Sequence, residues 1–156
     1  PEDSQQPFGA KAEEAKPKEE LKAGVIEFET GPVPIEFIEP IINSIPVDMT
    51  FVDENDKVVF FSKGEERIFL RTKAVIGRDV HLCHPEKSIH VVKKILADFR
   101  DKKRDIAEFW INLGGRMIHI RYFAVRSKEG KYLGCLEVSQ DITEIQKLEG
   151  QKRLLD

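Results

Sequence analysis

Residues 133–144 read LGCLEVSQDITE, the most informative segment for the fold. In a strand successive side chains point to opposite faces, so alternate residues from Leu133 to Ser139 share one face. Asp141 and Thr143 come directly after, and their side-chain oxygens suit the cap of a helix. The stretch therefore predicts a last strand that leads through a capped turn into a helix.

Working outward from this strand, period-two patterns predict four more strands. They lie at residues 47–53, 57–62, 106–112 and 117–126, and the last strand covers 132–140. The first two are joined by a turn at residues 53–56, and the next two by Gly114 and Gly115. Such short connections favour antiparallel pairing.

The helical patterns are of unequal strength. Residues 87–102 form the clearest helix, because apolar residues recur at i, i+3, i+4 and i+7. Residues 35–45 predict a short amphipathic helix that ends before Pro46. The tail after Asp141 has the apolar spacing of a coiled-coil start. The fold class is therefore α+β: a five-stranded antiparallel sheet with short helices and one long helix on one face, and with flanking N- and C-terminal helices.

Composition excludes several classes of protein. The 156 residues carry 25 basic and 28 acidic side chains, a balance that argues against a general electrostatic grip on nucleic acid. No apolar run approaches the roughly 20 residues of a membrane span, and no signal peptide is visible. Two cysteines cannot form a disulfide framework, so we expect a cytoplasmic protein. The chain starts without Met and is expected to be a fragment of a longer one.

Four short segments, in this order, carry a resemblance to a known family. They are SKGEERIF at 62–69, VIGR at 75–78, HPE at 84–86 and the last strand with its Asp-Ile-Thr at 133–144. Together they resemble a PAS domain from about Ile45 to Thr143. The start VDMTFVD at 47–53 also resembles the PAS group found downstream of hemerythrin-like domains.

This resemblance implies a sensory module whose internal pocket holds a small ligand or cofactor. It further implies a homodimer and a relay through the C-terminal helix to an effector or upstream domain of the same longer chain, with Asp141 and Thr143 at the exit. The chain then divides into a charged flexible linker (1–24), a leading helix or cap segment (25–46), the sensor domain (47–143) and the exit helix (144–156). An alternative is a ligand-free protein–protein interaction module with a filled interior.

Strand alternation and the resemblance together select the candidate pocket residues. They are Phe60, Val92, Leu96, Ile118, Ile120, Tyr122, Cys135 and Glu137. Glu137 is the unusual member, since a carboxylate facing a pocket must be paired, hydrogen-bonded or neutral. It either binds a polar ligand or pairs with a neighbouring Arg or Lys. Trp110, the single tryptophan, is expected in the core.

Haem or metal binding is a second alternative, because His81, Cys83, His84 and His90 fall within ten residues. Against it, His-Pro-Glu is common in PAS domains without metal, and His90 points away from the apolar face of its helix. Flavin photochemistry is not expected: Val80 follows Gly77-Arg78-Asp79, where light-sensing members carry the reactive Cys.

Enzyme function is not expected either. The chain has no phosphate-binding loop, since Gly114 and Gly115 are not followed by Lys and Ser or Thr. No Ser-His-Asp or Cys-His arrangement stands in a known motif context.

Overall fold

The computed structural model describes residues 24–65 and 67–155. The chain divides into two compact units, one ending at Phe37 and one beginning at Ile38. In the first unit, β1 (Val25–Phe28) and β2 (Gly31–Pro34) pair as an antiparallel hairpin with Val25 opposite Pro34. No sequence pattern predicted this hairpin. Helix α1 (Ile35–Ser44) spans the division between the units and agrees with the helix predicted at 35–45.

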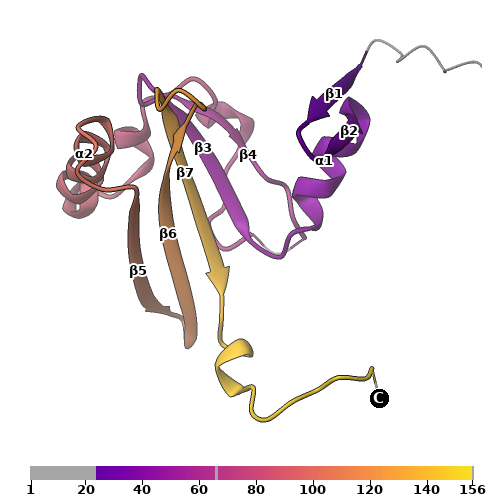
Figure 1. Ribbon diagram of the computed structural model, residues 1–156. Helices are drawn as coiled ribbons and strands as arrows, with labels where there is room; N and C mark the ends of the chain where they lie inside the picture. The colour runs from indigo at the N-terminus through magenta and orange to yellow at the C-terminus, as the bar shows by residue number, and fades with distance from the viewer. Residues whose placement is uncertain (1–23, 66, 156) are drawn as a thin grey trace, which may run out of the picture. The chain divides into compact units, whose positions relative to one another are not determined.

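The second unit contains the predicted five-stranded antiparallel sheet, whose strands lie in the order β4-β3-β7-β6-β5 (Figure 1). The strands are β3 (Asp48–Asp53), β4 (Val58–Phe61), β5 (Ile106–Leu113), β6 (Arg116–Arg126) and β7 (Tyr132–Asp141). Gly114 and Gly115 both have positive φ, 60° and 83°, as a tight two-residue hairpin requires. The last strand of the sequence is therefore central in the sheet, between β3 and β6.

Helix α2 (Glu86–Arg100) and two 3₁₀ turns, η1 (Lys73–Val75) and η2 (Val80–Cys83), lie in the connection between β4 and β5. The hydrophobic core forms where the apolar stripe of α2 meets one face of the sheet. Its buried members are Val52, Val58, Val80, Val92, Ile95, Leu96, Phe99, Ala107 and Cys135. The class is thus α+β, with the long helix packed on one face as predicted.

An irregularity beside Gly134 determines which face of the sheet each side chain of β7 points to. Val125 pairs with Gly134 but Arg126 pairs with Tyr132, so Leu133 is left without a partner across the ladder. A Cβ on Gly134 would lie 2.1 Å from the carbonyl oxygen of Val52, so only glycine fits. Tyr132 consequently packs against the core, and Leu133, expected on the inner face, is exposed.

Trp110 was expected in the core, and that prediction is wrong: the residue is 65% exposed. It lies on the edge strand β5, where alternation turns Phe109 and Ile111 toward the α2 side. Trp110 therefore points to the opposite face of the sheet.

The exit helix predicted for residues 144–156 is also wrong for the described residues. After Asp141 the chain forms only one 3₁₀ turn, η3 (Ile145–Lys147), and continues without helix to Leu155. Leu148 and Leu155 are exposed, so no apolar face is buried to stabilise a helix this short. No helix in 24–65 or 67–155 has the length and apolarity that crossing a membrane requires.

Candidate functional site

A cavity of about 760 Å³ lies between α2 and the inner face of the sheet, within the second unit. Its wall is mainly apolar, with Val91, Val92 and Ile95 from α2 and Phe109, Ile111 and Ile120 from β5 and β6. This size is in the range of pockets that hold small molecules, and such pockets typically combine an apolar wall with a few polar groups.

The polar groups of the cavity gather around Glu137 on β7. Its side chain is 10% exposed, and the nearest cation is Arg71, whose Nη2 lies 3.8 Å from Oε2. The Nε2 atom of His84 lies 4.0 Å from the same oxygen. Both separations exceed a hydrogen bond, so within the described chain the carboxylate has ion-pair partners but accepts no hydrogen bond.

The orientation of His84 follows from its other nitrogen. Nδ1 lies 3.0 Å from the carbonyl oxygen of Val80. A carbonyl only accepts, so Nδ1 carries a proton and donates it. Nε2 is left facing Glu137, 4.0 Å from its Oε2.

Burial controls the electrostatics of this site. Burial raises the pKa of Glu137, and the opposing effects of Arg71 and then His84 do not cancel it. Burial, with a smaller contribution from the Glu137 charge, also raises the pKa of Tyr122. The Tyr122 hydroxyl therefore stays protonated near neutral pH and available as a donor.

Arg71 is held by a segment that is itself tied to the sheet. The backbone N–H of Phe69 donates to Oδ2 of Asp48 on β3 at 2.9 Å, and Arg67 forms an ion pair with Asp48. Arg67 also donates to the carbonyl oxygen of Ser62. These bonds fix residues 67–71 across the cavity although the segment has no regular structure.

Four of the predicted pocket residues line the cavity: Val92, Ile120, Tyr122 and Glu137. The other four do not. Leu96 and Cys135 are buried in the core cluster, Ile118 is fully buried, and Phe60 is half-buried on β4. The predicted residues on β6 and β7 thus lie on the expected side of the sheet. The hydrophobic core, however, occupies part of that side, so only some of these residues reach the cavity.

Arg71 was missed, as was the position of His84 beside Glu137. Arg71 lies in the irregular stretch between β4 and η1, where no periodicity assigns a side chain to a face. The one usable signal was Glu137 itself, since a buried carboxylate requires a cation or donor nearby.

The metal candidates do not converge. Within the described residues no three of His, Cys, Asp and Glu side chains gather as a metal site would require. His81 Nε2 lies 3.6 Å from Asp79, whereas Cys83 and His84 line the cavity. His90 is exposed on α2.

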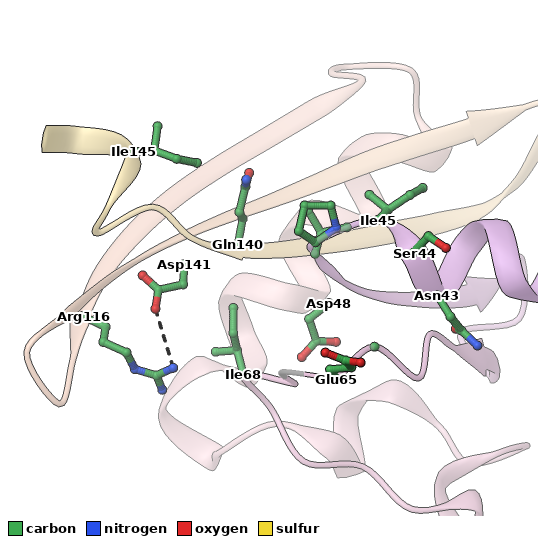
Figure 2. A pocket seen from close by; sticks show the side chains of 13 residues that line it. Asn43, Ser44, Ile45, Asp48, Glu65, Ile68, Arg116, Gln140, Asp141 and Ile145 are labelled. Carbon is green, nitrogen blue, oxygen red and sulfur yellow. Dashed lines mark ion pairs between the residues drawn. The ribbon is translucent and has the colours of Figure 1, made fainter. Parts of the chain in front are cut away.

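A second hollow, of about 580 Å³, lies beside the end of β7 (Figure 2). Here Oδ1 of Asp141 accepts from the backbone N–H of Thr143 at 3.0 Å and from its hydroxyl at 2.6 Å. The Thr143 hydroxyl oxygen accepts from the N–H of Met117 at 2.9 Å. Arg116 lies 3.7 Å from Asp141, the pair drawn with a dashed line in Figure 2.

These contacts correct the predicted helix cap. Asp141 and Thr143 do not cap an α-helix; they close a turn and tie the end of β7 to the start of β6. The hydrogen bonds from Thr143, side chain first and then backbone, lower the pKa of Asp141. The carboxylate is therefore charged at neutral pH, and its Oδ1 is engaged by Thr143.

Comparison with known sequences agrees with this architecture. The profile of the family described as PAS domain matches residues 38–143. No curated protein matches the chain.

Several solved structures are similar. The crystal structure of a C-terminal domain from Streptococcus mutans is 32% identical, with a TM-score of 0.75 over 80% of this chain and 97% of that one. A PAS domain from Colwellia psychrerythraea is 15% identical, with a TM-score of 0.52 over 70% and 98%. A sensory box sensor histidine kinase from Vibrio cholerae is 10% identical, with a TM-score of 0.50 over 69% and 90%. The last two likenesses concern the fold alone.

Proposed function

Because this chain belongs to the PAS domain family of sensory and regulatory modules, typically non-catalytic, we propose that it senses a small ligand in the cavity between α2 and the sheet. The ligand binds against Glu137, Arg71, His84 and Tyr122. Its presence is relayed through the Asp141–Thr143 turn to the C-terminal residues beyond it. The unit works as a homodimer and passes the signal to an effector or upstream domain.

One observation carries this proposal: the cavity combines an unfilled apolar volume with a buried carboxylate that lacks a hydrogen bond in the described chain. A module that serves only as an interaction surface would be expected to fill this volume with side chains. A buried, weakly paired carboxylate is costly for folding, and such groups gather at functional sites. Ligand binding gives the group a role that stability alone does not.

The relay is supported by the position of β7. Glu137 and the Asp141 turn lie on the same central strand, and the N–H of Ile142 donates to the carbonyl oxygen of Met117 at 2.9 Å. A ligand that shifts Glu137 acts on the strand whose end is fastened to β6. We expect hydrogen exchange at the Met117 and Thr143 amides to change when a ligand binds.

Native mass spectrometry of gently purified protein, together with thermal melting against a metabolite library, tests the binding. We expect a retained ligand or a stabilising compound, since a ligand at 100 times its Kd adds about 2.7 kcal/mol. Val91→Trp fills the cavity and should abolish both signals. Lys93→Trp places the same side chain on the exposed side of the same helix and should preserve them. No ligand and no stabiliser for the wild type would refute the proposal.

A further inference from the structure

We propose that the ligand of this cavity is a monocarboxylic acid with an apolar body, bound together with one proton. This inference rests on the proposed function and names its ligand class. The carboxylate binds at the polar end among Arg71, His84 and Tyr122, and the apolar body lies along the wall formed by α2 and β5.

The polar end of the cavity has a surplus of hydrogen-bond donors. Arg71 Nε is buried and has no hydrogen-bond partner in the described residues, and its Nη2 has only the 3.8 Å contact to Glu137. Tyr122, whose hydroxyl is a further donor, lines the cavity as well. A buried guanidinium normally has its donors satisfied, and a carboxylate, with two coplanar oxygens, is the acceptor that fits it best.

The same end lacks an acceptor for those donors. Glu137 is the one carboxylate among the described residues that line the cavity, and it lies too far from Arg71 and His84 to hydrogen-bond either. Asp48, another carboxylate near Glu137, is occupied by Arg67 and by the N–H of Phe69. The protein therefore supplies more donors than acceptors at this end, and the ligand is expected to supply the acceptor.

Charge balance explains why a proton accompanies the acid. In the ligand-free site Arg71 is balanced by Glu137 and Arg67 by Asp48. A bound carboxylate adds one negative charge, and buried charges are stable only when they are paired. Neutrality is restored when one proton is taken up by Glu137.

Two other groups near Glu137 do not compete for this proton. Burial raises the pKa of Tyr122 and raises that of Cys135 to about 12, so both are already protonated. The remaining titratable groups that face Glu137 or line the cavity are Arg67, Arg71, Asp48, Cys83 and His84. Burial raises the pKa of Glu137, which eases proton uptake by that group. Acid binding should therefore weaken as pH rises, by up to about tenfold per pH unit for one proton.

Matched compounds test the ligand class. Isothermal titration calorimetry at pH 6 and pH 8 would compare octanoate with octan-1-ol and octylamine, and 4-phenylbutyrate with its alcohol and amine. We expect the acid of at least one set to bind about tenfold more tightly than its partners at pH 6, and to bind more weakly at pH 8. The amine should bind least, because it would add a cation beside Arg71.

Three variants assign the effect. Arg71→Gln should remove the preference for the acid over the alcohol, about tenfold or more, while the alcohol still binds. Glu137→Gln should bring acid binding at pH 8 close to its value at pH 6. Arg78→Gln removes an exposed charge outside the cavity and should change nothing.

The inference is overturned if no acid binds, if alcohol or amine equals the acid in both sets, or if Arg71→Gln keeps the acid preference. A co-purified ligand without an acid group would also overturn it and leave the proposed function intact. The proposed function fails separately, when no compound of any class is retained or stabilises the protein.

Discussion

Glu137 and Asp141 are carboxylates four residues apart on the same central strand, yet their surroundings are opposite. Glu137 is buried beside a cavity, accepts no hydrogen bond in the described chain, and has a raised pKa. Asp141 lies at the strand end, accepts two hydrogen bonds from Thr143, and has a lowered pKa.

The difference shows that two carboxylates on one strand can differ in how much of their hydrogen-bonding capacity is already used. A carboxyl group with unused hydrogen-bonding capacity can respond to a ligand or a proton. Oδ1 of Asp141 is already engaged by Thr143, whose hydroxyl joins the two strands, and the lowered pKa keeps this carboxylate charged near neutral pH. Alternation puts both residues on the same side of β7. Their surroundings differ because different segments lie beside them, residues 67–71 beside Glu137 and residues 116–117 beside the Asp141 turn.

The largest effect is expected from Gly134→Ala, which would break both sites at once. The added Cβ would lie 2.1 Å from the Val52 carbonyl oxygen, so β7 would have to move away from β3. We expect a loss of more than about 3 kcal/mol in the free energy of unfolding, measured by urea denaturation. Gly64→Ala is the control, because its nearest neighbour would be 3.8 Å away. Equal stability of the two variants would show that the bulge at Gly134 does not determine which way the side chains of β7 point.

Next in size is the pH dependence that Glu137 gives to stability. Its pKa is higher in the folded state than its ordinary value of 4.5, so the folded protein binds more protons above that value. Stability should therefore fall as pH rises from 4.5 toward the folded-state pKa, by about 1.4 kcal/mol for each pKa unit of the shift. Glu137→Gln should abolish this fall, and Glu149→Gln, at an exposed site, should retain it. Urea denaturation at a series of pH values would measure both slopes.

Much of this architecture could be predicted from the sequence because it depends on local periodicity. All five strands of the second unit and α2 were found close to their observed ranges, since each buries one face against the same core. The last strand and its Asp-Ile-Thr were recognised by family resemblance, and the structure adds that Gly134 is required by a close approach to Val52.

The remaining features depend on tertiary contacts that no local pattern encodes. Trp110 is exposed because it lies on an edge strand. The order of strands in the sheet cannot be predicted from the sequence pattern of one strand. Arg71 reaches Glu137 only because Arg67 and Phe69 are bonded to Asp48, far away in sequence. Leu96 and Cys135 have the pattern of pocket residues, yet they are used to fill the core.

A smaller effect is expected at the other carboxylate, from Thr143→Val. The variant loses the hydroxyl that accepts from the Met117 N–H, which should cost about 1 kcal/mol. Asp141 contributes stability above its ordinary pKa of 3.8 that is lost as pH falls through its lowered folded-state value. Acid unfolding of the variant should therefore be less steep, the opposite sign to the Glu137 effect. Thr72→Val is the control, since the Thr72 side chain makes no cap hydrogen bond.

The smallest effect is expected from deleting residues 149–156, the segment on the C-terminal side of the Asp141 turn. The described part of this segment is exposed and non-helical, so its removal should change the free energy of unfolding by less than about 0.5 kcal/mol. Urea denaturation at two protein concentrations would measure it. A larger loss that grows with concentration would mean that the tail packs against a second copy, in line with the coiled-coil spacing of Ile145, Leu148 and Leu155. In that case the turn at Asp141 would lead into a dimer contact, and its part in the molecule would differ from that of a simple connection between β7 and β6.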